Sequence, residues 1–316
     1  MSRQWVSYNN GNYTVSINIF NGTKIRQNNL DFFEPDTEES MDIKITNKCG
    51  GEAGYANPKC AMCHEGSGPL GKHGDILSTS FLDNLHPYCE LAIGGGNPLQ
   101  HPDLDKFLEK CKERRHIPNM TVNQRHFLQE FDRVKKLCQD RLIFGLGISL
   151  TEVTPELIEK VKQIPTAVIH VINGLITEDQ LNKLKHNGLK ILVLGYKQVR
   201  RGQKLYEKAS EQIEQRKSML KQLLPTIINE GWFQVISFDN LALKQLDVRS
   251  HMTDDEWNQF YMGDDGLDGE QTSSSMFIDM VERKFAKNSC APMDERYDLM
   301  DTAEDMFNFL RKGSQQ

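Results

Sequence analysis

The pattern of hydrophobic and polar positions changes near residue 41. Before it, residues 5–8, 13–20 and 23–26 alternate apolar and polar side chains at a period of two, and Asn- and Gly-rich turns separate them. Alternation of this kind with Asn-Gly turns is typical of β-hairpins. We therefore expect residues 1–40 to form a small N-terminal β extension.

From residue 41 to 240, short apolar runs alternate with amphipathic stretches. The apolar runs, each suited to a strand buried on both faces, are 42–48, 89–95, 117–123, 142–149, 166–173, 189–196 and 232–238. The helical stretches lie near 78–86, 103–115, 126–140, 154–163, 177–186 and 203–230. Repeated β/α units predict an α/β fold with a parallel sheet, either an open doubly wound sheet or a barrel.

The pattern breaks after residue 238. A turn-rich acidic segment at 264–269 is followed by runs at 276–281 and 283–286, which favour a hairpin, and by a short helix over about 302–310. This tail is too small for an independent domain. We expect residues 241–316 to form a C-terminal cap on the sheet.

Composition narrows the class of protein. The 316 residues carry a net charge of −6, which does not favour a broad basic surface for nucleic acid. No run approaches the roughly 20 apolar residues of a membrane span, and the polar start is unlike a signal peptide. Seven cysteines without an export signal favour a reducing compartment. We expect a cytoplasmic protein without a membrane partner.

Three of the cysteines occupy one loop directly after the run 42–48. These are Cys49, Cys60 and Cys63, and the next apolar run ends in the glycines at 94–96. Ligands bind at the carboxyl ends of parallel strands, where both features fall. Thiolates are the usual ligands of iron–sulfur clusters, and glycine lets the backbone approach a ligand closely. The pattern predicts a metal cluster beside a small polar ligand.

Two other kinds of site remain open at this point. A structural zinc ion could take the same thiolates with His64 as its fourth ligand, although adjacent Cys63 and His64 would have difficulty reaching one ion together. A phosphate or dinucleotide site could use the glycine run. That run lacks both the G-x-G-x-x-G spacing and the G-K-[ST] ending of phosphate-binding loops.

Residues 46–49, the pair Cys60 and Cys63, and the segment 95–99 together resemble the motifs of the radical S-adenosylmethionine (radical SAM) superfamily. Its usual motifs are CxxxCxxC and GGEP, and the likeness covers residues 41–240. Residues 63–65, 71–75 and 237–242 are similar to uncharacterised radical SAM proteins of phages and bacteria. The chain departs twice from the family pattern. Ten residues separate Cys49 from Cys60, and Asn97 stands where the family has Glu.

The resemblance implies a partial parallel (β/α)6 barrel, a [4Fe-4S] cluster on Cys49, Cys60 and Cys63, and SAM as the second cofactor. It implies an enzyme that cleaves SAM reductively to a 5′-deoxyadenosyl radical, which abstracts hydrogen from a small molecule, a peptide or a nucleotide. A reductase or flavodoxin-type protein would supply the electron. The alternative is a non-catalytic iron–sulfur or zinc protein on a degenerate barrel.

The resemblance also implies which residues contact SAM. Met62 would lie near adenine, Ser149 near the ribose or the carboxylate, and main-chain groups of the glycine run near the ammonium. The full expected set is Met62, Gly94, Gly95, Gly96, Asn97, Asn123, Ser149 and Asn173. We expect Gly95→Val to weaken SAM binding while the cluster still assembles.

Two further groups of polar residues are candidates of lower specificity. His64, Glu65, Lys72, His73 and Asp75 form a titratable segment that could bind substrate or move a proton, or could be a solvated loop. Arg200 and Arg201 form a basic spot that could meet a phosphate or carboxylate, or could be ordinary surface charge.

Overall fold

Two β-sheets organise the part of the chain that the computed structural model describes, residues 4–20, 22–29, 33–51, 60–260 and 274–312. The smaller sheet contains β1 (Trp5–Asn10), β2 (Tyr13–Asn18) and β3 (Lys24–Gln27). The larger sheet contains β4 (Ser40–Thr46), β5 (Glu90–Gly95), β6 (Ile117–Asn123), β7 (Gly145–Ser149), β8 (Ala167–Ile172), β9 (Lys190–Leu194), β10 (Val235–Phe238), β11 (Ser275–Asp279), β12 (Lys284–Ala286) and β13 (Tyr297–Asp298).

Helices connect these strands. The α-helices are α1 (Ser80–Asp83), α2 (Leu104–Glu113), α3 (Gln124–Gln129), α4 (Phe131–Gln139), α5 (Pro155–Lys162), α6 (Glu178–Leu184), α7 (Arg201–Asn229), α8 (Asn240–Leu246), α9 (Asp254–Phe260) and α10 (Ala303–Lys312). The 3-10 helices are η1 (Pro98–Gln100), η2 (Val248–His251) and η3 (Met293–Glu295). The helix expected at 126–140 is therefore divided in two at Glu130, whose φ of −106° and ψ of 25° are not helical.

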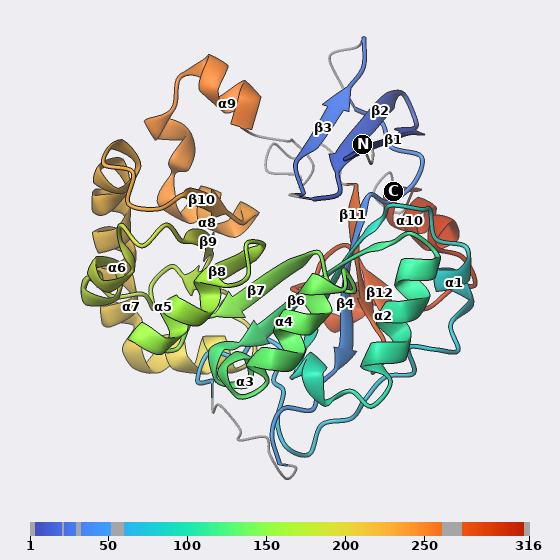
Figure 1. Ribbon diagram of the computed structural model, residues 1–316, viewed down its shortest axis with the longest axis horizontal. Helices are drawn as coiled ribbons and strands as arrows, with labels where there is room; N and C mark the ends of the chain where they lie inside the picture. Colours follow the sequence, from blue (N-terminus) through green and yellow to red (C-terminus); the bar gives the residue numbers. More distant parts are fainter. Residues whose placement is uncertain (1–3, 21, 30–32, 52–59, 261–273, 313–316) are drawn as a thin grey trace.

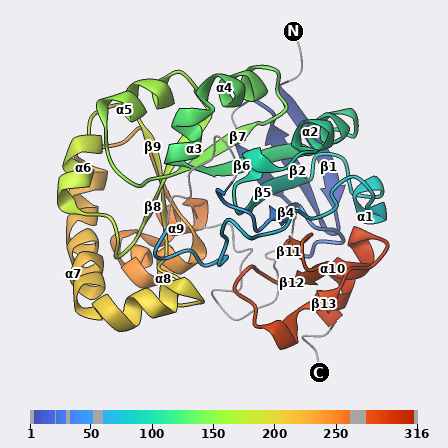
Figure 2. The ribbon, with the colours of Figure 1, turned by 90° about the horizontal axis from the view of Figure 1, so that it is seen from below.

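The order of the large sheet is β10-β9-β8-β7-β6-β5-β4-β11-β12-β13, and β4 to β10 are all parallel. A doubly wound sheet reverses its strand order at a switch point. Here each strand from β5 to β10 lies beside the one before it, and α2, α4, α5, α6 and α7 follow one another around the outside (Figure 2). This winding is typical of barrels, so the doubly wound alternative is wrong. The sheet is open among the described strands, with β10 at one edge and β13 at the other.

Several of the parallel strands are buried on one face only. Along β8 the residues alternate between buried and half-buried, and the same alternation runs through β6. The prediction of strands buried on both faces is therefore wrong for these elements. Helices cover the outer face, whereas the opposite face of the sheet is turned toward the centre of the molecule (Figure 2). We call that inner face of β4 to β10 the lumen.

The N-terminal segment forms an antiparallel sheet in the order β1-β2-β3. It lies at one end of the large sheet in Figure 1. The carboxylate of Glu39, just before β4, joins the two. It accepts hydrogen bonds from Tyr13 Oη at 2.5 Å and from Arg26 Nε at 2.9 Å, and Lys24 Nζ lies 3.2 Å away. A buried charge held by two cations and a hydroxyl fixes the extension against the sheet.

The C-terminal segment contains the expected hairpin, β11 with β12, and the expected helix, α10. The acidic segment 264–269 lies outside the described residues. Unlike a separate cap, β11 pairs in parallel with β4 and so extends the main sheet beyond its first strand. The tail therefore forms part of the wall that carries the cysteine loop.

Candidate functional site

The loop between β4 and α1 folds back beside η1. Cys49 N donates to Gly68 O at 2.9 Å, and Lys72 N donates to Asn47 Oδ1 at 2.5 Å. Gly50 N donates to Gln100 Oε1 at 2.7 Å, which ties the loop to the end of β5. These bonds hold the first cysteine at the carboxyl end of the sheet. We call residues 47–72 the cysteine loop.

The structure brings the three cysteines of this loop together. Cys49 is buried, and Cys60 and Cys63 are half-buried. Burial raises the pKa of the Cys49 thiol to about 12, and the thiolate charges of Cys60 and Cys63 add to the rise. Burial, followed by the Cys63 charge, also raises the pKa of Cys60. Thiols that act on one another in this way are close in space, and a bound cation would offset their mutual repulsion.

A second neighbour of these thiols comes from β6. Asn123 Nδ2 lies 3.6 Å from Cys60 Sγ in hydrogen-bonding orientation, while Asn123 Oδ1 caps α3 by accepting from Arg125 N at 3.0 Å. Asn123 is thereby oriented toward the cysteine loop. Its register partner on β7 is Ser149, and both are half-buried on the lumen. The structure thus places two of the expected SAM contacts near the cysteines.

The three thiols of the cysteine loop do not suit a single metal ion and an iron–sulfur cluster equally well. Within the described ranges, no group of three or more His, Cys, Asp or Glu side chains is arranged to hold a metal ion. His64 Nε2 is 3.4 Å from Glu65 Oε1, so the side chain suggested as a fourth zinc ligand is directed to a carboxylate. Each thiolate of an iron–sulfur cluster binds a different iron, which requires wider spacing than one zinc ion. The donor set of three neighbouring thiols fits a cluster better than a closed zinc site.

The three glycines after β5 differ in what surrounds them. A Cβ on Gly95, whose φ is +110°, would lie 2.2 Å from Thr46 O, and a Cβ on Gly96 would lie 2.1 Å from Lys48 O. These two glycines allow the end of β5 to pass close to the end of β4. A Cβ on Gly94 would meet no described atom within 4 Å. The open approach that the sequence assigned to Gly95 therefore belongs to Gly94.

Asn97 and Asn173 do not face the lumen. Both are fully buried. Asn97 Oδ1 accepts from Leu99 N at 3.3 Å and caps η1. Asn173 Nδ2 donates to Gln245 Oε1 at 3.1 Å, which also accepts from Tyr196 N. Asn97 Nδ2 and Asn173 Oδ1 have no partner among the described residues. In this conformation the two side chains secure the strand ends rather than present themselves to a ligand.

Met62 and the two arginines meet at the start of α7. A Cβ on Gly202 would lie 3.6 Å from Met62 O, so the cysteine loop reaches this helix. Arg201 Nη2 donates to Ser67 O, and Arg200 Nη1 donates to Glu65 O at 2.7 Å. The Arg201 charge also counteracts the rise in the pKa of Cys49 and Cys60. The basic spot is therefore a support for the cysteine loop, not free surface charge.

A chain of buried ion pairs joins the cysteine loop to β4 and β11. Lys44 Nζ lies 2.9 Å from Asp279 Oδ2 and 3.3 Å from Glu65 Oε2. Arg296 Nη1 is 3.6 Å from Asp279 Oδ2, and Arg200 Nη1 is 3.6 Å from Glu65 Oε2. Burial would raise the pKa of Glu65, but the hydrogen bond and charge of His64, with Lys44 and Arg200, lower it to about 2. Glu65 is thus a structural anion rather than a proton carrier.

The other residues of the polar segment have local roles. His73 Nδ1 is 3.0 Å from Thr46 Oγ1, and Asp75 Oδ1 accepts from Leu77 N and Ser78 N at 3.1 and 3.0 Å. Hydrogen bonds led by Ser78 N lower the pKa of Asp75. These contacts fit the solvated-loop alternative.

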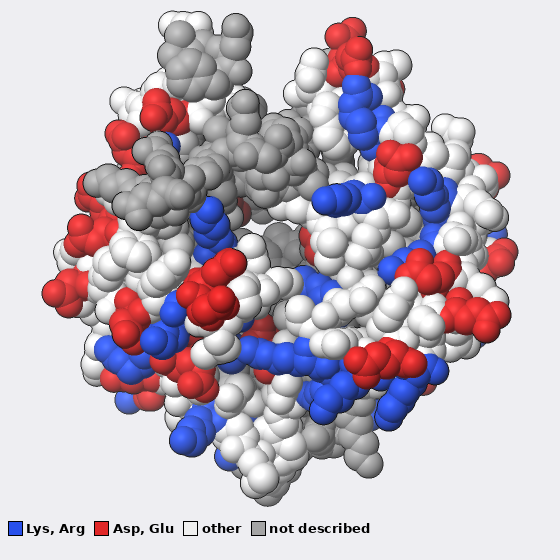
Figure 3. Space-filling model, turned by 180° about the vertical axis from the view of Figure 1, so that it is seen from behind, with Lys and Arg blue, Asp and Glu red and all other residues white. Residues whose placement is uncertain are grey.

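Sequence reasoning missed the polar residues that face the lumen, chiefly Asp42 on β4 and His170 on β8. The His170 ring lies against Gly147, since a Cβ built on Gly147 would come within 2.3 Å of the ring. Burial lowers the pKa of His170 to about 4. Asp42 is exposed, as is Ala92 beside it on β5. The molecule is hollowed near the centre of the face in Figure 3. The signal available in the sequence was Asp42, a charged residue within the apolar run 42–48.

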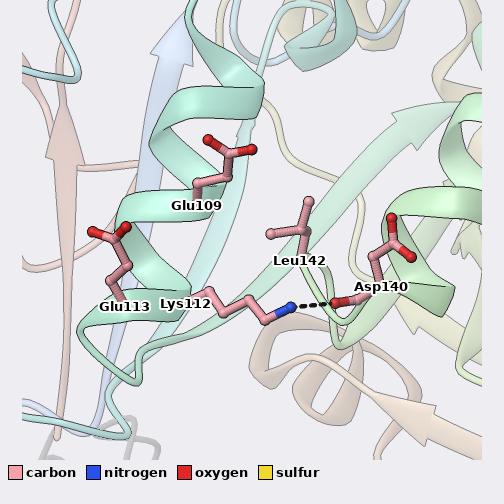
Figure 4. A pocket seen from close by; sticks show the side chains of 5 residues that line it. All are labelled: Glu109, Lys112, Glu113, Asp140 and Leu142. Carbon is pink, nitrogen blue, oxygen red and sulfur yellow. Dashed lines mark hydrogen bonds between the residues drawn. The ribbon is translucent and has the colours of Figure 1, made fainter.

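A surface depression lies at the opposite end of the strands. Glu109, Lys112, Glu113, Asp140 and Leu142 line it (Figure 4), and Lys112 Nζ donates to Asp140 O at 2.8 Å. It lies where α2 and α4 end, just before β6 and β7 begin. That is the amino end of the sheet, away from the cysteines, so we assign it no part in the site.

The fold and site define an α/β protein with a large parallel sheet and three thiols at its carboxyl edge. No family model and no curated protein sequence matches the chain. Among solved structures, SuiB of Streptococcus suis bound to S-adenosylmethionine is similar over 100% of this chain and 90% of SuiB, with a TM-score of 0.64 and 12% identity. SuiB bound to its precursor peptide SuiA is similar over 92% and 83%, with a TM-score of 0.54 and 12% identity.

Likeness at this identity establishes the fold. The chain thus shares the fold of a protein that binds SAM. No helix of the described residues is long and apolar enough to cross a membrane.

Proposed function

We propose that the chain is a radical SAM enzyme in which Cys49, Cys60 and Cys63 hold a [4Fe-4S] cluster. The observation that carries the proposal is that these three thiols act on one another in the loop after β4, while Gly94 leaves open space near the end of the neighbouring strand β5. The strand order and outer helices support a partial (β/α)6 barrel, and the fold shared with a SAM-bound protein supports the second cofactor.

When bound, the cluster would supply the electron that cleaves SAM to methionine and a 5′-deoxyadenosyl radical. The chain's own residues would position and shield this chemistry. Gly94 leaves room for SAM at the end of β5, and Asn123 and Ser149 offer polar groups on the neighbouring strands. Arg201 and Asn123 would reduce the negative charge at the thiolates by charge and hydrogen bonding.

A peptide is the substrate class that we favour, because the similar protein SuiB has been crystallised with a precursor peptide. A reductase or a flavodoxin-type protein would be the electron donor. We also propose that the protein works in the cytoplasm, where its thiols would stay reduced.

Anaerobic reconstitution tests the cluster. We expect about four irons per chain, a broad absorption shoulder near ~400 nm, and release of 5′-deoxyadenosine from SAM with dithionite. Replacing Cys49, Cys60 and Cys63 together by Ala should abolish all three. The matched control replaces by Ala two cysteines outside the loop, Cys138 on α4 and Cys290 just before η3, and should keep the cluster.

Iron bound equally by the triple variant and wild type would refute the proposal. A second candidate, a non-catalytic cluster protein, is favoured by the burial of Asn97 where the resembling family has Glu. It predicts four irons per chain without release of 5′-deoxyadenosine.

A further inference from the structure

Asp42 differs from the other acids around the lumen because no cation is paired with it. Asp279 contacts Lys44 and Arg296, and Glu65 contacts Lys44. Among the described residues, no side chain or backbone group forms a hydrogen bond or ion pair with the Asp42 carboxylate. The Asp42 side chain is exposed to the lumen, yet the surrounding protein disfavours its ionised form, so an unpaired carboxylate at this position is suited to bind a ligand.

The charges around Asp42 come from two loops. Lys197 follows β9, and His64 and Glu65 belong to the cysteine loop. The charges of all three influence Asp42 electrostatically without a direct contact. Lys197 Nζ is held by Ser289 Oγ at 3.3 Å instead. Burial raises the pKa of Asp42, with Lys197 opposing the rise and Glu65 adding to it. The site therefore favours neutralisation of the carboxylate.

Space for a ligand lies next to the carboxylate. Asp42 pairs in register with Ala92, which is small and exposed, and the next lumen level joins Lys44 to Gly94. Two residues along a strand span roughly 7 Å, so Asp42 lies one level below the open backbone at Gly94. A group that neutralises Asp42 would thus lie beside the proposed SAM site.

We propose that Asp42 binds a basic nitrogen of the substrate, an ammonium or guanidinium group, in the lumen next to SAM. The inference rests on the proposed function and adds the charge of the substrate group. A carboxylate with a cation forms charge-assisted hydrogen bonds, which are about twice as strong as neutral ones. A neutral apolar group at the same place would leave the carboxylate unpaired.

Ligand-observed NMR at pH 8 with three probes tests this: N-acetyl-lysine amide, N-acetyl-arginine amide and N-acetyl-norleucine amide. Wild type should bind the two cationic amides at least about tenfold more tightly than the norleucine amide, a factor that corresponds to about 1.4 kcal/mol. Asp42→Asn should lose this preference. Asp132→Asn, which changes an exposed acid on α4, should keep it. Equal binding of all three probes by wild type, or a preference that survives in Asp42→Asn, would overturn the proposal.

Two further measurements separate this inference from its alternatives. The melting temperature of Asp42→Asn at pH 8 should equal or exceed that of wild type, because an acid whose pKa is raised by folding destabilises the fold when ionised. A lower melting temperature would assign Asp42 a structural role. SAM cleavage without substrate should be detectable in wild type. Its absence from wild type would refute the proposed function instead.

Discussion

The contrast between Gly94 and Gly95 separates a ligand-facing glycine from a structural one. Alanine at Gly95 would hold a side chain at φ +110°, which costs about 1–3 kcal/mol. Its Cβ would also push against Thr46 O, which accepts the 2.7 Å bond from Gly96 N, and loss of that bond adds about 1 kcal/mol. We expect Gly95→Ala to lower the free energy of unfolding by about 2–4 kcal/mol.

Alanine at Gly94 meets open space and should change the free energy of unfolding by less than about 1 kcal/mol. Gly94→Val should also fold, but its methyl groups would occupy the space proposed for SAM. We expect its affinity for SAM to fall at least about tenfold, the loss of roughly one good polar contact.

Urea unfolding measures the first effect, and equilibrium dialysis of SAM with reconstituted protein measures the second. The reasoning is refuted if Gly94→Val binds SAM like wild type, or if Gly95→Ala is as stable as wild type. The Gly95→Val test suggested by the sequence is unsuitable, because the larger side chain would disturb the β4–β5 contact before any ligand was involved.

Two further predictions concern stability. Lys44→Met should lower the free energy of unfolding in urea by about 3–5 kcal/mol, because the buried Asp279 carboxylate loses its paired lysine. Adding Asp279→Leu to Lys44→Met should recover part of this loss. The control Lys136→Met breaks an exposed ion pair and should change the free energy of unfolding by less than about 1 kcal/mol. Burial lowers the pKa of His116 to about 4 in the folded protein. As the pH falls from ~6.5 to ~4, the unfolded chain therefore binds a proton at this histidine that the folded protein does not bind, and the free energy of unfolding should decrease. The urea midpoint of wild type should drop more than that of His116→Gln from pH 7 to pH 5; parallel curves would contradict this.

Periodicity in the sequence predicted most strands and helices of the parallel sheet, because each β/α unit buries its own apolar stripe. It did not predict which strand faces stay open. The run 166–173 is apolar enough for a fully buried strand, yet half of β8 faces the lumen and His170 lies among those positions. Whether a barrel is filled or hollow depends on side chains from several strands at once, such as Gly147 opposite His170.

The candidate site was predictable as far as it depends on local order. Cysteines after one strand and glycines after the next must meet at the same edge of a parallel sheet. Individual side-chain directions were not predictable. Asn97 follows the glycine run, but its oxygen caps η1 and its side chain is fully buried. Only the path of the backbone after β5 decides that direction.

The supports of the cysteine loop come from parts of the chain that no local pattern connects. Lys44 and Asp279 are 235 residues apart, and they meet because β11 joins the open edge of β4. Lys44 also holds Glu65, two residues beyond Cys63. One lysine therefore links the C-terminal strand to the loop that carries the thiols. The motif resemblance in the sequence is confined to residues 41–240, so the segment expected to be a cap supplies part of the frame on which the proposed cluster site depends.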